Sequence, residues 1–291
     1  MINKKRKLVV ASGKGGVGKS MLASALAMLF SKKYATIAVD CDVDAPNLAV
    51  WLNEVKRWDK KRKISVSEKP LINNKKLKEN PEKYAKKCRF GALSAEKGKL
   101  KLNPFLCEGC GACEIFCPPG VIKMKPVVGG EIKIKKTKYG FSLISGQLFP
   151  GETGSGKIVT EVKKQAEKFD FEIMIIDSSP GTGCPVIASL QGAGFAVLVT
   201  EPTPSGLSDL KRVLEVVNHF KIPWGLVINK WDINLQLANK IKRWSRNRFL
   251  GKLSFDKEIF RSVSSLTPIL ETNLKTKKEI KKVFEAIQRV W

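Results

Sequence analysis

Residues 11–20 read ASGKGGVGKS and stand between an apolar, strand-like run, KLVVA (7–11), and a helical pattern that extends to about residue 31. Glycine-rich turns let backbone N–H groups close around phosphate oxygens, and a helix that starts there adds its positive end. Lys19 is placed to reach the β- and γ-phosphates, and the Ser20 hydroxyl is placed to hold Mg²⁺. The stretch therefore predicts a phosphate-binding loop between a first strand and a first helix.

Short β-branched runs alternate with helix-length segments in the rest of the chain: TIAVD (36–40), FEIMIID (171–177), FAVLVT (195–200) and WGLVIN (224–229). Buried strands separated by helices are typical of an α/β fold with a doubly wound, mostly parallel sheet. The pattern stops near residue 54 and resumes after residue 140. We therefore expect a discontinuous nucleotide-binding domain, 1–53 and 141–291, and a small inserted α+β domain, 54–140, that starts with a basic linker or hairpin arm.

The last segment, KTKKEIKKVFEAIQRVW (275–291), places its apolar residues on one helical face and lysines on the other. Such a helix can lie on a membrane, but this pattern favours a final helix docked on the sheet.

A second glycine-rich stretch, GETGSGK (151–157), resembles a phosphate-binding loop only superficially. Ile158 occupies the position where Mg²⁺ needs a hydroxyl, so we do not expect a second nucleotide site there.

The composition describes a folded, basic protein of 291 residues with 43% hydrophobic residues. No run of about 18 apolar residues and no signal-peptide pattern occurs, and most of the seven cysteines stand at metal-ligand spacing. A cytoplasmic location is therefore expected.

The positive charge is unevenly distributed. Residues 51–140 hold 23 Lys and Arg against 9 Asp and Glu, a net +14 of the total +26. This field suits acidic proteins, nucleic acid or anionic membranes, but a solvated lysine-rich surface is favoured because no nucleic-acid-binding motif accompanies it.

The cysteines of CEGCGACEIFCP (107–118) have the spacing C-x-x-C-x-x-C-x-x-x-C-P of bacterial ferredoxins, which predicts one 4Fe-4S cluster. In two-cluster ferredoxins the fourth cysteine of such a run binds the other cluster, so the fourth ligand here is open. The upstream stretch NPEKYAKKCRFGAL (80–93) resembles the end of a first ferredoxin run. That resemblance implies Cys88 as the partner of Cys107, Cys110 and Cys113. Cys117 is then a buried free thiol, although four ligands from 107–117 remain the simpler alternative.

Lys14 adds a second lysine to the loop, and KGGVGKS (14–20) is similar to the deviant Walker A motif of MinD/ParA/Mrp ATPases and the nitrogenase iron protein. The resemblance implies an ATP-bound homodimer in which Lys14 reaches the partner's nucleotide. It extends to VDCDVDAPN (39–47) and IIDSSPG (175–181). Asp42 matches the water-positioning carboxylate, Asp177 the Walker B aspartate and Gly181 the switch glycine; Asp40 and Asp44 are acidic neighbours of unassigned role.

The resemblance also implies a base pocket, in which Asn229 resembles the adenine-reading amide and Pro202, within EPTP (201–204), shapes the walls. The expected catalytic residues are Lys14, Lys19, Asp42 and Asp177. The expected nucleotide-binding residues are Gly13, Lys14, Gly15, Gly16, Val17, Gly18, Lys19, Ser20, Met21, Gly181, Pro202 and Asn229, with Ser20 on Mg²⁺.

Nearly the whole chain resembles MinD-superfamily ATPases with an inserted ferredoxin domain, although members usually carry two complete cysteine runs. The resemblance implies a slow Mg-ATPase coupled to electron transfer or to metal-cluster assembly or delivery, with an acidic redox protein or metalloprotein as partner. The alternative is a positioning or scaffold ATPase of ParA/MinD type that binds DNA, a membrane or an acidic partner and keeps the cluster as a structural element. No motif indicates contact with nucleic acid or membrane.

Overall fold

The computed structural model describes residues 5–291. Its strands are β1 (Arg6–Ala11), β2 (Thr36–Cys41), β3 (Lys60–Ile72), β4 (Leu93–Glu96), β5 (Lys99–Leu102), β6 (Ile122–Lys136), β7 (Ser142–Leu148), β8 (Ile173–Ser178), β9 (Phe195–Thr200), β10 (Trp224–Asn229) and β11 (Phe249–Leu253). Its α-helices are α1 (Lys19–Phe30), α2 (Leu48–Trp51), α3 (Glu82–Ala85), α4 (Ala112–Phe116), α5 (Ser155–Glu167), α6 (Cys184–Leu190), α7 (Pro204–His219), α8 (Leu235–Ser245), α9 (Glu258–Ser264) and α10 (Lys275–Val290). Single 3₁₀ turns are η1 (Asn74–Lys76), η2 (Trp231–Ile233), η3 (Arg246–Arg248) and η4 (Ile269–Glu271).

One nine-stranded sheet organises the molecule, in the order β11-β10-β9-β1-β8-β2-β7-β6-β3. The seven strands from β11 to β7 are parallel, whereas β6 and β3 at one edge are antiparallel. The predicted α/β fold with a mostly parallel sheet is confirmed. The central strands carry unbroken apolar runs because helices cover both of their faces.

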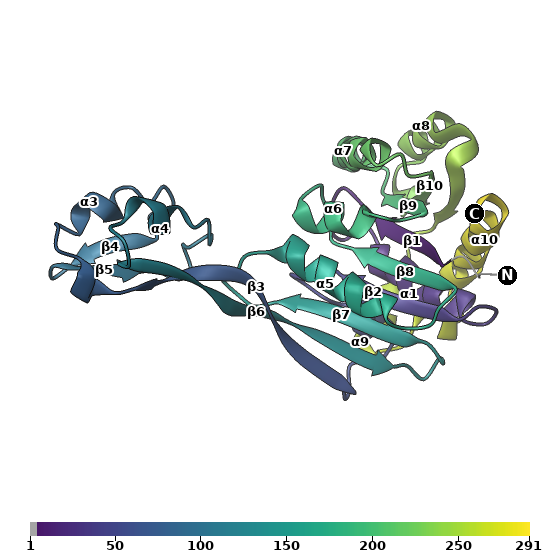
Figure 1. Cartoon of the computed structure of the whole chain (residues 1–291). Helices are drawn as coiled ribbons and strands as arrows, with labels where there is room; N and C mark the ends of the chain where they lie inside the picture. Colours follow the sequence, from purple (N-terminus) through teal and green to yellow (C-terminus); the bar gives the residue numbers. More distant parts are fainter. Residues whose placement is uncertain (1–4) are drawn as a thin grey trace.

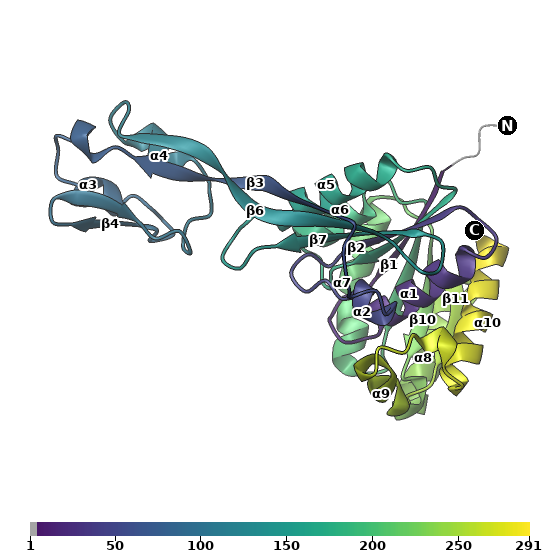
Figure 2. The ribbon, with the colours of Figure 1, turned by 90° about the horizontal axis from the view of Figure 1, so that it is seen from below.

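Helices pack on the two faces of the sheet and form two separate apolar layers (Figures 1 and 2). Side chains of α5, α6, α7 and α8 pack on one face. The other face is covered by α1 and α10, with α2 beside them. All twelve residues of α1 are buried, so this helix is held between the sheet and its neighbours.

The final helix α10 docks on the sheet as its amphipathic pattern predicted. Ile280, Val283, Phe284 and Ile287 are buried, while the lysines of the opposite face are exposed. Within residues 5–291, none of the helices combines the length and the apolar character needed to cross a bilayer.

The basic segment predicted as a linker or hairpin arm forms half of a long two-stranded ribbon. β3 pairs with β6 from Lys60–Ile134 to Ile72–Ile122, and residues 130–136 of β6 also pair with β7. Beyond that point β3 and β6 pair only with each other and run away from the rest of the molecule (Figures 1 and 2). Where the ribbon leaves the sheet, Gly129 is an extra residue in β6 and Val66 is an extra residue in β3.

A small unit, which we call the distal unit (residues 73–121), lies at the far end of the ribbon (Figure 1). It contains α3, α4 and the β4–β5 hairpin, and its apolar centre includes Tyr84, Leu93, Leu100 and Val121. Of the two expectations for the basic segment, linker or hairpin arm, the antiparallel pairing of β3 with β6 fits the hairpin arm. The domain boundaries at 54 and 140 stay a prediction, and both of these strands belong to the main sheet.

A buried ion pair fixes the base of the ribbon. The Lys135 ammonium lies 2.7 Å from a carboxylate oxygen of Glu54, whose other oxygen accepts the Lys138 backbone N–H at 2.7 Å. The Glu54 side chain is only 6% exposed. Removal of one member of such a pair leaves a buried charge without its counterion.

Replacing Glu54 with alanine should therefore lower the free energy of unfolding by about 3 kcal/mol, near the lower end for such pairs because Lys135 keeps two backbone carbonyl acceptors. Urea denaturation measures the change. Glu96→Ala is the matched control, since Glu96 pairs with Lys101 on the exposed surface of the distal unit and should cost less than about 1 kcal/mol. Equal losses in both variants would show that the Glu54 pair does not fix the ribbon.

Candidate functional site

A cavity of about 570 Å³ lies at the carboxyl edge of the parallel sheet. Its walls come from segments that follow β1, β2, β8, β10 and β11, so residues far apart in sequence meet there. Ligands of doubly wound sheets bind at this edge. Of the predicted nucleotide-binding residues, Gly15, Gly16, Gly18, Lys19, Ser20, Met21 and Asn229 line the cavity, as does Asp42.

The glycine-rich loop leads directly into the buried helix α1. Gly18 has a φ of +93°, and a Cβ there would lie 2.4 Å from the Asn229 amide nitrogen, so only glycine fits. Lys19 and Ser20 follow it and are both buried. Within residues 5–291, the Lys19 ammonium forms no ion pair with a carboxylate, which leaves this buried cation for an anionic ligand.

Three carboxylates converge beside the loop. Asp40 and Asp177 are register partners on β2 and β8, both are fully buried, and Asp42 follows two residues after Asp40. Burial raises the pKa of Asp177 above its ordinary value, against the opposing effect of Lys19 and Ser20. Burial also raises the pKa of Asp42 and, together with the nearby Asp177, that of Asp40.

The hydrogen bonds of these carboxylates separate their roles. Asp40 accepts the backbone N–H groups of Asp42 and Leu48 at 3.2 and 3.0 Å, so it orders the loop after β2. Neither oxygen of the buried Asp177 has a hydrogen-bond partner within the described chain. An unpaired buried carboxylate next to Ser20 fits a Mg²⁺ site, since Mg²⁺ prefers carboxylate and hydroxyl oxygens. Asp44, whose role was open, is exposed at the cavity wall.

Asn229 holds the loop as well as lining the cavity. Its amide nitrogen donates to the Val17 carbonyl at 2.8 Å, and its amide oxygen accepts the Lys230 backbone N–H at 2.9 Å. One N–H and one lone pair of the amide remain for a ligand. Val17, a predicted binding residue, therefore contacts Asn229 and does not itself line the cavity.

Several predicted residues lie outside the cavity wall: Gly13, Lys14, Val17, Asp177, Gly181 and Pro202. The Gly181 N–H donates to the Ser12 carbonyl at 2.9 Å, so the predicted switch glycine contacts the loop instead. Pro202 is buried beside β9.

One wall of the cavity is apolar and was not predicted. It is formed by Trp51, Phe255, Ile259 and Phe260. The aromatic spacing of SFDKEIF (254–260) was the available signal, but β11 before it had not been recognised.

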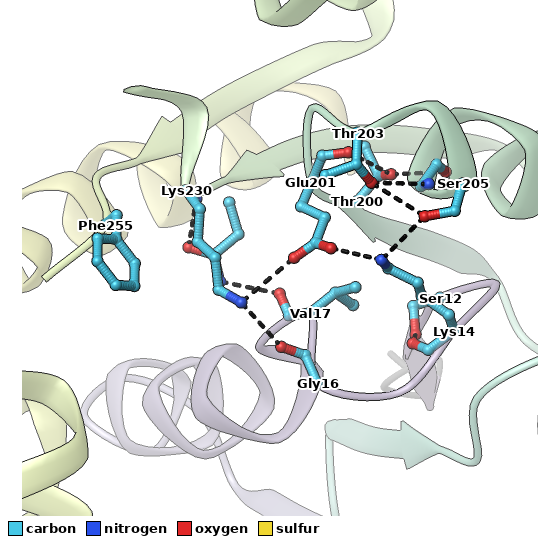
Figure 3. Close-up of polar contacts among 12 residues, drawn as sticks. Ser12, Lys14, Gly16, Val17, Thr200, Glu201, Thr203, Ser205, Lys230 and Phe255 are labelled. Atoms are coloured by element: carbon cyan, nitrogen blue, oxygen red, sulfur yellow. Dashed lines mark hydrogen bonds and ion pairs between the residues drawn. The ribbon is translucent and has the colours of Figure 1, made fainter. Parts of the chain in front are cut away.

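Lys14 turns away from the cavity towards β9. Its ammonium lies 2.5 Å from Glu201 Oε1 and 3.3 Å from the Ser205 hydroxyl (Figure 3). The second oxygen of Glu201, Oε2, lies 3.2 Å from the Lys230 ammonium, which also donates to the Gly16 carbonyl at 3.4 Å. Although burial opposes it, hydrogen bonds from Lys14 and Lys230 lower the pKa of Glu201, which is therefore an anion held between two cations.

A second cavity, of about 290 Å³, lies in the distal unit, and its lining includes Cys88, Cys107, Cys110 and Cys113. Cys117 is not in this lining; it packs in the apolar centre of the unit. Gly109 fits closely against the β3 backbone, because a Cβ there would lie 2.5 Å from the Glu68 carbonyl oxygen. Across residues 5–291, no group of three or more His, Cys, Asp or Glu side chains is arranged to hold a metal ion. The cluster therefore stays a prediction.

Comparison with known proteins identifies the nucleotide-binding part. Residues 8–269 match the CobQ/CobB/MinD/ParA nucleotide binding domain. An uncharacterized protein of Methanocaldococcus jannaschii is 36% identical over 284 residues, which cover 97% of this chain and 96% of that protein. The iron-sulfur cluster carrier protein of Pyrococcus abyssi is 25% identical over 272 residues, covering 87% and 75% of the two chains. The crystal structure of the Pyrococcus furiosus cell division ATPase MinD superposes with a TM-score of 0.61 at 18% identity, covering 98% and 99%.

Replacing Lys19 with alanine should weaken Mg-ATP binding by at least about a hundredfold. The reason is the loss of a buried charge-assisted contact worth about 3 kcal/mol. Titration calorimetry measures the affinity. Lys33→Ala, an exposed change beyond the end of the same helix, should bind as the parent does. Undiminished binding by the Lys19 variant would exclude this loop as the phosphate site.

Proposed function

The chain belongs to the CobQ/CobB/MinD/ParA nucleotide-binding family, whose MinD/ParA members are P-loop ATPases, and on this basis we propose a function for its two cavities. The protein is a Mg²⁺-dependent ATPase that dimerises around ATP and carries one 4Fe-4S cluster. The four cluster ligands are Cys88, Cys107, Cys110 and Cys113. ATP turnover is coupled to electron transfer or to the assembly or delivery of a metal cluster.

The residues around the cavity at the carboxyl edge of the sheet, which we call the nucleotide edge, support the proposed ATP hydrolysis. Backbone N–H groups of the glycine-rich loop and the buried Lys19 ammonium neutralise the phosphates. Ser20 and Asp177 would hold Mg²⁺, which supplies positive charge at the β- and γ-phosphates. Asp42 lines the cavity and is placed to orient a water. That water forms a bond to the γ-phosphorus while the bond to the β,γ-bridging oxygen breaks, giving ADP and phosphate.

The cysteine-lined cavity is the observation that carries the cluster half of the proposal. It draws Cys88 from the segment after α3, Cys107 and Cys110 from the segment that leads into α4, and Cys113 from α4 itself. This is the division of ligands that ferredoxin pairing requires. Burial and the neighbouring Cys107 raise the pKa of the Cys113 thiol to about 11, and a bound metal would reverse this by stabilising the thiolate. When bound, the cluster supplies a one-electron centre.

On this proposal the distal unit, with the ribbon that carries it, is an inserted ferredoxin-like domain spanning residues 54–140. Lys87 and Arg89 line the cysteine cavity, and residues 51–140 carry a net charge of +14. This charge fits an acidic redox protein or metalloprotein as the partner. The similarity to an iron-sulfur cluster carrier protein supports the same direction.

A second candidate is a positioning or scaffold ATPase, which the similarity in fold to the cell division ATPase MinD favours. The two functions differ in what accelerates ATP hydrolysis. An acidic redox protein or a cluster-accepting apo-protein should stimulate the first, whereas DNA or anionic vesicles should stimulate the second. Hydrolysis rates measured anaerobically with each addition decide between them.

Exchanging Asp42 for asparagine should leave ATP binding intact and slow single-turnover hydrolysis by about 10²-fold or more, because loss of the carboxylate misplaces the attacking water. The variant should accumulate as an ATP-bound dimer in size-exclusion chromatography with light scattering. Asp170→Asn, an exposed change before β8, should hydrolyse ATP normally. Hydrolysis by the Asp42 variant at the parental rate would remove Asp42 from the mechanism.

Two serine variants test the cluster ligands after anaerobic purification. The parent should contain about four iron atoms and four sulfides per chain. Cys88→Ser should lose or destabilise this cluster, while Cys117→Ser should keep it because Cys117 packs outside the cavity. Iron and acid-labile sulfide analysis with visible absorption gives the readout, and the reverse pattern would assign the fourth ligand to Cys117.

A further inference from the structure

Glu201 occupies an unusual position, because one carboxylate contacts two lysines that belong to the nucleotide site. Glu201 comes directly after β9 in the chain, and its side chain is 12% exposed. The carboxylate lies between the loop after β1 and the end of β10 (Figure 3). Glu201 Oε1 pairs with Lys14, and Glu201 Oε2 pairs with Lys230. The segment EPTP (201–204) was expected to shape the base pocket, but Glu201 is not among the residues that line the cavity.

The two lysines are not held equally. Lys230 donates to the Gly16 carbonyl, and its backbone N–H is fixed by Asn229. Among residues 5–291, the Lys14 ammonium has only Glu201 and the exposed Ser205 hydroxyl as partners, and its side chain is 30% exposed. Lys14 is therefore the member of the trio that can leave.

Breaking the Lys14–Glu201 pair does not leave the Glu201 carboxylate without a counterion. Lys230 stays beside Glu201, so the carboxylate keeps one counterion when the other is withdrawn. An ammonium group that pairs with Glu201 cannot at the same time contact the phosphates of a second chain. The free chain thus holds Lys14 in a contact that competes with the one required in the ATP-bound dimer.

We propose that Glu201 is a positioning residue that stores Lys14 within its own chain, and that ATP-dependent dimerisation must break the Lys14–Glu201 ion pair. This inference rests on the proposed ATP-bound dimer. It adds that the strength of the stored pair sets the protein concentration at which dimers form.

The test uses the full-length chain with Mg²⁺ and a non-hydrolysable ATP analogue, and measures the dimer dissociation constant by analytical ultracentrifugation. Glu201→Gln keeps the shape of the side chain but removes its charge. The dissociation constant should fall about fivefold, the size expected for one partly exposed ion pair. The affinity of the monomer for the analogue should not change. Ser205→Ala, which removes only the weaker contact, should shift the constant in the same direction by less.

Two controls separate storage from a structural role. Glu131→Gln breaks a similarly exposed ion pair, with Lys133, in the ribbon and should leave dimerisation unchanged. A Lys14→Ala chain lacks the contact required in the dimer and should not dimerise, and adding Glu201→Gln to it should not restore dimerisation, because the cation that Glu201 holds is already absent. A purely structural pair would instead weaken nucleotide binding whether or not Lys14 is present.

The outcomes distinguish this inference from the proposed function. If the parent does not dimerise with the analogue, the ATP-bound dimer itself is wrong. If the parent dimerises and Glu201→Gln dimerises equally or more weakly, storage of Lys14 is wrong while the dimer stands. Recovery of dimerisation when Glu201→Gln is added to Lys14→Ala would also overturn the inference.

Discussion

Burial of the Asp177 carboxylate at the end of a central strand governs the nucleotide edge of this protein. β8 lies between β1 and β2, so Asp177 has no access to water, and its register partner Asp40 adds a second buried acid. Burying an unpaired carboxylate costs several kcal/mol, and a like charge beside it adds to that cost. Either positive charge or protonation relieves the cost, and burial accordingly raises the pKa of Asp177. The buried Lys19 supplies positive charge that opposes this rise.

Burial and backbone geometry decide which features of this protein can be predicted from its sequence. The glycines of the phosphate-binding loop are recognisable because Gly18 needs a left-handed backbone beside Asn229, and no other residue type fits. The central strands are recognisable because burial on both faces demands unbroken apolar runs. The Lys14–Glu201 pair was beyond reach, since only the parallel pairing of β1 with β9 brings its members together. The apolar wall after β11 was missed because this short edge strand mixes lysine and glycine with apolar residues and was not recognised.

A series of packed segments beside the main sheet leads from the distal unit to the edge that carries the first cavity. In the segment before α5, Gly151 lies against the Phe105 ring of the distal unit, and Glu152 pairs with Lys69 of β3 at 2.7 Å. Helix α5 then packs against α6, which follows the segment after β8. These contacts link the segment after β8 to both the ribbon and the distal unit.

The paired irregularities of the ribbon have a consequence for how this architecture can vary. The extra Gly129 in β6 is offset by the extra Val66 in β3, so residue pairing has the same phase on both sides of the bend. A single inserted residue would turn every side chain beyond it to the opposite face. Lengthening or shortening the arm of this chain while keeping each side chain on its face therefore takes matched changes on both strands, in steps of two residues or about 7 Å. The pleat of the ribbon thus sets the spacing between the two cavities in discrete steps.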